Sequence, residues 1–288
     1  MSEADFEARL RALRPRLHRY CARMTGSAID GEDVLQDALV KALHAQADGA
    51  MVDNLGGWLL RIAHNCCLDF LRRRARVELV PLDEGMAHAA RPDTDIVTLG
   101  FHAFLQLPEL QRCAVILKDV LGHTVEEIAA IAGSTPAAAK SALQRGRSTL
   151  RQRAAKPIAT PARADAEKLA SYVQLFQQGD FDAIRALLAE DVQLELVNRL
   201  KLAGREQIAP YFSRYAAEPK WCYALGTFEQ HPAMLVYDHT RPDQPAHMVL
   251  LEWRQGRIAS IRDFLFAAYV LDGAAWRKLQ GRLEITTE

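Results

Sequence analysis

The stretch that decides the fold of the N-terminal half is residues 124–151, which read TVEEIAAIAGSTPAAAKSALQRGRSTLR. Residues 124–127 (TVEE) predict a capping box that opens a short helix. We expect Gly133 to turn the chain and Thr135 to cap a second helix. Pro136 would be the first residue of that helix, where a missing N–H costs nothing. A helix, a four-residue turn and a basic helix together form the helix-turn-helix layout.

The second helix of this motif carries side chains that suit DNA. Arg and Gln can read guanine and adenine edges in the major groove, whereas Lys and Ser can hold phosphates. The candidates on this helix are Lys140, Ser141, Gln144, Arg145, Arg147 and Arg151. The alternative is an ordinary helical hairpin with a charged outer face, and spacing alone leaves that alternative open.

The residues before this motif also have helical periodicity, from Phe6 to about Arg76. Gly26 is expected to end the first helix and Asp30 to cap the second, with Asp33 completing a variant capping box. The second helix should bury five apolar side chains, which are Val34, Leu35, Ala38, Leu39 and Leu43. A loop over residues 47–57 precedes a third helix, which ends in the arginine cluster at residues 72–74.

The formal net charge is +0, but it is unevenly distributed along the chain. Residues 1–76 carry a net +2, residues 77–100 a net −4, residues 101–160 a net +4 and the remainder a net −2. The two basic blocks could each meet a phosphate backbone, although charge alone favours solvated helix faces. The acidic stretch and the PIATP segment at residues 157–161 are typical of linkers.

The five cysteines are scattered and include no CxxC pair. They predict neither a disulfide framework nor a metal site, and we expect buried free thiols in a reducing cytosol. The first thirty residues lack an apolar signal core, and no apolar run approaches the length of a membrane span. These observations predict a cytoplasmic protein with no membrane, metal or cofactor.

From Asp165 onward the pattern changes. Two or three helices come first, over residues 166–178, 181–188 and 206–215. Alternating strand-like runs follow at residues 192–197, 223–228, 233–237, 246–254 and 257–265, and Gly256 forms a hairpin turn between the last two. This order predicts an α+β domain.

Four motifs in the first 155 residues together resemble the extracytoplasmic-function (ECF) sigma factors of bacterial RNA polymerase. Residues 30–37 (DGEDVLQD) are similar to the acidic region 2.2, and residues 58–74 are similar to regions 2.3 and 2.4. Residues 107–112 (LPELQR) resemble the opening of region 4, and residues 124–151 its helix-turn-helix. The motifs occur in the family's order, and the linker stands in the expected place.

This resemblance implies a role for each motif. Region 2.2 would dock on the β′ clamp of core polymerase, through Asp33, Gln36 and Asp37. Regions 2.3 and 2.4 would open and hold the −10 element of promoter DNA, through Asn65, Asp69, Arg72 and Arg73. Region 4 would meet the β flap and read the −35 element, through Lys140, Ser141, Gln144 and Arg145. A pocket for a flipped base is expected in the loop at residues 47–57.

The recognition helix departs from the family pattern. Residues 137–139 and Ala142 are alanines where the family often places a small polar residue and an arginine. Few side chains of this helix should therefore contact base edges, and recognition should rest partly on DNA shape.

Residues 165–283 resemble a SnoaL-like domain, the cone-shaped α+β fold shared with ketosteroid isomerases. Residues 179–181 (GDF), 187–192 (LLAEDV) and 256–264 (GRIASIRDF) carry the resemblance. Such cones can enclose a pocket for a small ligand. The candidate polar groups for such a pocket are Asp238, His239, His247, Trp253, Arg262 and Asp263. We favour partly exposed strand residues without a catalytic role, because no His–Asp pair has a spacing that demands catalysis.

The sequence therefore predicts two all-α regions followed by an α+β domain. The expected boundaries are region 2 at 5–76, a linker at 77–100, region 4 at 101–155, a linker at 156–164 and the SnoaL-like domain at 165–283. The expected function is promoter recognition without catalysis, with the last domain regulating in cis. The alternatives are a SnoaL-like enzyme or ligand-sensing domain fused to a DNA-binding regulator, and a transcription regulator with the helix-turn-helix alone. The match to region 2 argues against both.

Overall fold

The computed structural model describes residues 3–49, 52–77, 100–152, 163–229 and 231–279. The chain divides near residue 157 into two compact units, which we call the N-terminal and the C-terminal unit. Most of the two expected linkers, 78–99 of the first and 156–162 of the second, lies outside the described residues. The five expected boundaries stay predictions. Within the described ranges, no helix combines the length and the hydropathy that a membrane span requires.

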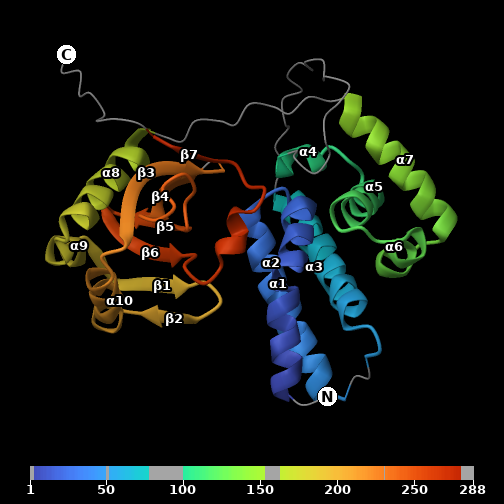
Figure 1. Ribbon diagram of the computed structural model, residues 1–288, viewed down its shortest axis with the longest axis horizontal. Coiled ribbons are helices and arrows are strands. Elements are labelled where there is room, and N and C mark those ends of the chain that lie inside the picture. Colours follow the sequence, from blue (N-terminus) through green and yellow to red (C-terminus); the bar gives the residue numbers. More distant parts are fainter. Residues whose placement is uncertain (1–2, 50–51, 78–99, 153–162, 230, 280–288) are drawn as a thin grey trace. The chain divides into compact units, whose positions relative to one another are not determined.

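The N-terminal unit opens with three helices that pack on one another: α1 (Glu3–Thr25), α2 (Ala28–Ala47) and α3 (Leu55–Val77) (Figure 1). Gly26 has a φ of 81° and ends α1, as expected. The expected cap of α2 is wrong. Ser27 is the N-cap, and its hydroxyl accepts hydrogen bonds from the amides of Ile29 and Asp30, both at 3.2 Å. Because Ser27 follows the left-handed Gly26 directly, the helix starts at the first residue able to cap it.

The same unit continues with α4 (Phe101–Phe104), α5 (Glu109–Val115), the π-helical turn η2 (Ile116–Val120), α6 (Val125–Ala132) and α7 (Pro136–Gln152). A salt bridge fixes the end of η2 against α7, because the Arg147 guanidinium binds both carboxylate oxygens of Asp119, with Nε to Oδ2 at 2.9 Å. Gly146 lets α7 approach α5 closely, since a Cβ there would lie 2.7 Å from a Val115 methyl group.

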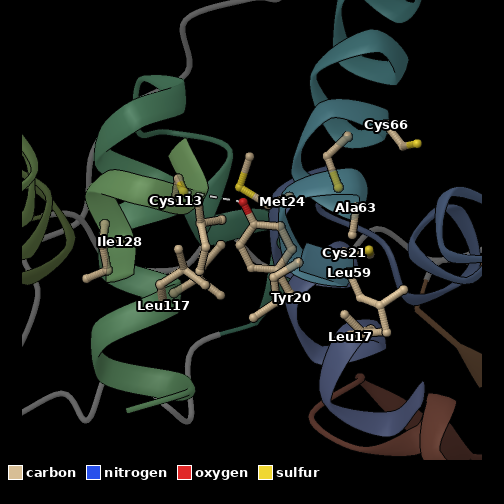
Figure 2. Packing of buried hydrophobic residues seen from close by; sticks show 14 of the residues in the cluster. Leu17, Tyr20, Cys21, Met24, Leu59, Ala63, Cys66, Cys113, Leu117 and Ile128 are labelled. Carbon is tan, nitrogen blue, oxygen red and sulfur yellow. Dashed lines mark hydrogen bonds between the residues drawn. The ribbon is translucent and has the colours of Figure 1, made fainter. Parts of the chain in front are cut away.

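One hydrophobic core serves all the helices of this unit (Figure 2). Leu17, Tyr20 and Met24 from α1 meet Cys113 from α5 and Leu117 from η2 in it. All five side chains are at most 2 % exposed. The two helical halves that the sequence predicts as separate regions are therefore packed together.

The C-terminal unit is α+β, as expected. Its helices are α8 (Arg163–Gln178), α9 (Phe181–Ala186) and α10 (Arg205–Ala217), and η3 (Ala268–Leu271) is a single 3-10 turn. Its strands are β1 (Leu188–Leu196), β2 (Leu200–Ala203), β3 (Trp221–Phe228), β4 (His231–Asp238), β5 (His247–Arg254), β6 (Arg257–Asp263) and β7 (Trp276–Lys278).

These strands form one sheet in the order β2-β1-β6-β5-β4-β3-β7, in which only the β1–β6 pair is parallel (Figure 1). The two short edge strands, β2 and β7, are not among the strands that the sequence predicts. The prediction that α9 continues to Leu188 is wrong, because Leu188 begins β1 opposite Ile258. The β5–β6 turn is confirmed: Gln255 and Gly256 have φ angles of 53° and 75°, which suits a type I′ hairpin.

Helices α8 and α10 supply aromatic side chains to the core of this unit, among them Tyr172, Phe176, Phe212 and Tyr215. They pack with inward-facing strand residues such as Met234, Val236, Val249 and Ile261. Of the five cysteines, four are buried free thiols, as expected, but Cys222 on β3 is exposed. Its strand alternates between faces, which places position 222 on the solvent side.

Candidate nucleic-acid interface

The helix-turn-helix forms by the local bonds that its sequence predicts. The Thr124 hydroxyl accepts from the Glu127 amide at 3.2 Å, and the Glu127 carboxylate accepts from the Thr124 amide at 2.8 Å. This second bond lowers the pKa of Glu127. Gly133 is left-handed at a φ of 61°, and the Thr135 hydroxyl caps α7 through the Ala138 amide at 3.2 Å. Three local signals thus set where α6 begins, where it ends and where α7 begins.

Helix α7 presents the predicted −35 side chains on its outer face. Lys140, Gln144 and Arg145 are exposed, and Ser141 is half-buried. Ala139, Ala142 and Leu143 pack inward against the core. Arg147 belongs to the salt bridge with Asp119, so its guanidinium is committed within the unit.

Helix α3 carries the predicted −10 residues near its C-terminal end. Asn65, Asp69, Arg72 and Arg73 are all exposed. Arg72 binds the Asp69 carboxylate at 3.3 Å, and Arg73 donates from Nε to the Asp69 carbonyl at 3.3 Å. Asp69 therefore contacts both arginines, through exposed and hence weak interactions. The next residue, Arg74, reaches back to Asp30 on α2 at 3.3 Å, a pairing that the sequence analysis missed.

Helix α2 carries the predicted polymerase-docking residues. Asp33 and Asp37 are exposed one turn apart, and Gln36 is half-buried beside them. Val40 and Leu43 continue along the exposed side of the helix and are 51 % and 42 % exposed. The expectation that Leu43 is buried is wrong, because the core contacts of α2 run through Val34, Leu35, Ala38, Leu39 and Ala42.

A buried ion pair joins the inner face of this helix to α1. Glu32 has a fully buried side chain and binds Arg14 of α1 at 2.8 Å. Burial of an unpaired carboxylate is strongly unfavourable, so this pair fixes which face of α2 turns inward. The sequence does not predict this pair, since nothing in the acidic run DGED marks its third residue as the buried one.

A cavity of about 230 Å³ lies where the base pocket is expected. From the expected loop, Asn54, Gly56 and Gly57 line it, whereas residues 50–51 of that loop lie outside the described residues. The cavity is also lined from α1 and α3, by Leu13, Arg16, Leu17 and Leu60. Its remaining lining comes from the turn before α6 and the first turn of α6, through Gly122, His123 and Glu127. The Asn54 side chain accepts from the Gly57 amide at 3.0 Å and so caps the start of α3.

In the C-terminal unit, two of the six candidate pocket residues come together. His247 and Asp263 are buried, with Nε2 and Oδ1 3.7 Å apart. The hydroxyl of Tyr215, which the sequence analysis did not select, donates to Asp263 Oδ2 at 2.7 Å and lies 2.8 Å from His247 Nε2. Burial lowers the pKa of His247, an effect that Asp263 opposes, and burial raises the pKa of Tyr215.

The other four candidates lie elsewhere. Asp238 binds Thr240 in the turn after β4, and His239 is exposed beside it. Arg262 binds Glu195 at 2.9 Å on the neighbouring strand, and Trp253 is half-buried under Lys168. Among the residues that the structure describes, no group of three His, Cys, Asp or Glu side chains could hold a metal ion.

Comparison with known proteins defines the class. The family model described as Sigma-70 region 2 matches residues 10–77, and that described as Sigma-70, region 4 matches residues 102–150. The helices α1–α3 and the helix-turn-helix thus lie in two regions of the sigma-70 type.

Relatives of known name narrow the class further. The chain is 34 % identical over 226 residues to the ECF RNA polymerase sigma factor SigG of Mycobacterium tuberculosis, covering 67 % of this chain and 61 % of SigG. It is 32 % identical over 147 residues to the ECF RNA polymerase sigma factor SigM of the same species, covering 50 % of this chain and 74 % of SigM. This chain belongs to the ECF RNA polymerase sigma factors.

A solved structure also matches part of the chain. It is described as a putative ketosteroid isomerase from Kribbella flavida, is 20 % identical and has a TM-score of 0.28. The match covers 34 % of this chain and 75 % of that chain.

Proposed function

We propose that this protein directs core RNA polymerase to promoters, with α7 at the −35 element and α3 at the −10 element. The observation that carries this proposal is that the predicted contact residues on α2, α3 and α7 are exposed or half-buried in a chain of this family. The match to SigG spans 61 % of that relative. The activity proposed for this chain therefore rests on the residues that its own helices expose.

Promoter binding would combine electrostatics with limited base readout. Arg72 and Arg73 at the end of α3 would hold the backbone of the −10 element, and Asn65 would face an opened base. On α7, Gln144 and Arg145 have the chemistry for base edges, and Lys140 for phosphate. The alanines at 139 and 142 are buried, so the base-reading surface would be narrow.

Docking on core polymerase would use the outer face of α2. Two carboxylates and a half-buried glutamine stand beside exposed Val40 and Leu43. Exposed apolar side chains flanked by polar and charged ones are typical of a protein–protein surface, whose centre is apolar and whose rim is polar. We place the β′ clamp on this face and the β flap on region 4, and propose that the protein acts in the cytoplasm with the polymerase. Run-off transcription with core polymerase on a promoter library tests the proposal, which fails if no promoter is transcribed above the level of core alone.

Two substitutions on α7 separate base readout from phosphate contact. Arg145→Ala should weaken binding to the preferred −35 element by about 1–3 kcal/mol and relax preference at one base pair, because a bidentate contact to guanine would be lost. Lys140→Ala should weaken binding to all DNA sequences about equally and reduce the salt dependence of binding. Binding titrations on promoter variants at two salt concentrations measure both effects. Uniform losses in both variants would exclude base readout by Arg145.

We further propose that the C-terminal unit regulates transcription in cis. Truncation near Pro161 should change promoter output while core binding survives, because the proposed core and DNA contacts all precede that residue. In vitro transcription by the full-length and truncated proteins at equal concentration measures the change. Identical activity on every active promoter would contradict regulation in cis.

One observation favours a second function for this unit, namely binding of a small ligand. The hydroxyl of Tyr172 is buried and has no hydrogen-bond partner in the structure, and it lies near enough to Asp263 for the carboxylate to raise its pKa further. Buried polar groups are normally paired, so a bound molecule or water could satisfy this one. If truncation leaves transcription unchanged, a ligand screen on the full-length protein against Asp263→Asn is the next test.

A further inference from the structure

We infer that Asp119 and Arg147 are a positioning pair, which sets the rotation of helix α7 about its own axis and so aims Gln144 and Arg145 at the bases of the −35 element. Arg147 then acts through α7 and makes no contact with DNA itself. The inference rests on the proposed function and gives a role to two residues outside the four predicted −35 contacts.

The pair joins two segments of region 4 that lie 28 residues apart in the sequence. Arg147 Nε donates to Asp119 Oδ2 at 2.9 Å, and Nη2 of the same guanidinium donates to Oδ1. The side chain of Asp119 is 15 % exposed and that of Arg147 is 34 % exposed. Two parallel, charge-assisted bonds between a guanidinium and a carboxylate fix the direction of both side chains. The pair therefore opposes movement of α7 relative to the segment that carries Asp119.

Asp119 lies in the π-helical turn η2, which follows α5 directly. The Leu121 amide donates to the Ile116 carbonyl, five residues back, at 3.1 Å. Such a turn holds more residues than an α-helical turn, so its side chains point in directions that a continuing α-helix would not give them. Turns of this kind are rare and are frequent at functional sites. Here the turn brings the Asp119 carboxylate to Arg147 on α7.

The residue before Arg147 supplies a second, steric constraint. Helix α7 packs on α5 (Figure 1), and a Cβ at Gly146 would lie 2.7 Å from a Val115 methyl group and 3.1 Å from the Gln111 carbonyl oxygen. The glycine thus sets how closely the two helices approach. Arg147 lies about 100° further around α7, on its flank. A close approach limits the distance between two helix axes, whereas a directional bond on the flank of a helix opposes its rotation.

The rotation of α7 decides where its base-reading side chains point. At about 100° per residue, Gln144 and Arg145 lie about 60° and about 160° around the helix from Arg147. On a helix about 10–12 Å across, a rotation of about 20° moves the end of a side chain by about 2 Å. Hydrogen bonds to base edges are only about 2.7–3.2 Å long, so this shift would break a bidentate contact. The flexible stem of a lysine on a phosphate tolerates such a shift better. Loss of the pair should therefore reduce sequence preference more than affinity.

The alternative role for Arg147 is a direct contact with a phosphate of the DNA backbone. The two roles predict opposite effects when the charge of Asp119 is removed. If Arg147 held a phosphate, its release from the carboxylate would tighten binding to every DNA sequence. If the pair positions α7, the same change would reduce the preference for the −35 sequence.

The experiment uses holoenzyme assembled from core polymerase and the full-length protein. Transcription is measured on the preferred promoter and on promoters with one −35 base pair replaced, and the ratio of the two outputs is the specificity ratio. Asp119→Asn should lower this ratio about tenfold, as expected for the loss of one bidentate base contact. The affinity of this holoenzyme for promoter-free DNA should stay the same or rise, because the substitution removes a negative charge.

Arg147→Lys is the second variant, because lysine keeps the charge but lacks the planar fork that binds a carboxylate bidentately. It should lower the specificity ratio by a similar factor, whereas a phosphate contact would survive this change. The double variant should be no worse than either single variant, because all three lose the same pair. Glu126→Gln is the control, since it removes the charge of an exposed carboxylate on α6 and should leave the ratio unchanged.

Three outcomes would overturn the inference and leave the proposed function intact. The first is an unchanged specificity ratio in Asp119→Asn or in Arg147→Lys. The second is losses that add in the double variant. The third is loss of binding to promoter-free DNA together with the helix signal in circular dichroism, which would show a purely structural role. Wild-type holoenzyme without any −35 preference would instead contradict the proposed function, and the inference with it.

Discussion

Gly31→Ala is expected to lower the free energy of unfolding of the N-terminal unit by about 2–3 kcal/mol, net of the gain in helix propensity. A Cβ at position 31 would lie 2.5 Å from both the amide nitrogen and the Cα of Ala22 on α1. Backbone atoms cannot swing aside as the end of a side chain can, so α1 and α2 must separate. The helix that carries Asp33 and Asp37 would then shift relative to the rest of the unit.

Thermal unfolding followed by the helix signal in circular dichroism measures the effect. The Tm should fall by about 4–12 °C. Gly56→Ala is the matched control, because it also lies in a helix but its Cβ would meet only the Asn54 side chain, at 3.7 Å. That variant should be unchanged or more stable by up to about 1 kcal/mol. Equal stability of the two variants would show that α1 and α2 do not cross as closely as described.

The double charge reversal Asp33→Lys with Asp37→Lys is expected to weaken core polymerase binding about 100-fold. Both carboxylates are exposed on one face of α2, so the reversal should spare the fold. It places two cations where we propose that the β′ clamp meets two anions, and like-charge contacts across an interface cost several kcal/mol. A binding titration with fluorescent protein and core polymerase measures the change.

The control reverses the charges of Asp5 and Glu7 on α1, which are both exposed. This reversal changes the net charge by the same amount. Comparable losses in the two double variants would point to general electrostatics rather than docking through α2. Unchanged binding by the α2 variant would contradict the proposed docking surface directly.

Local signals made the helix-turn-helix predictable. Thr124, Glu127, Gly133 and Thr135 act on amides within four residues of themselves, so their spacing along the chain is enough to place α6 and α7. The same holds for the exposed positions of α3 and α7, which follow from helical periodicity. The resemblance then assigned these helices to sigma regions, which the family models confirm.

Long-range pairing made other features unpredictable. The edge strand β2 has no register until β1 folds beside it, and Asp263 meets His247 and Tyr215 only because β6, β5 and α10 come together. Leu43 has the hydrophobicity of a core residue, yet the core ends before reaching it. In each case the partner lies far away in the sequence, and no periodicity encodes it.

By itself, then, the sequence determined the helical elements of regions 2 and 4, the α+β character of the C-terminal unit, and the family. Capping, periodicity and motif order act over a few residues and are readable in one dimension. Only the tertiary structure decided that Tyr20 reaches Cys113, that Arg112 binds the end of α1 and that Glu32 is the buried carboxylate of its run. These contacts depend on how whole helices pack, which is set by the shapes of surfaces that form only after the local elements exist.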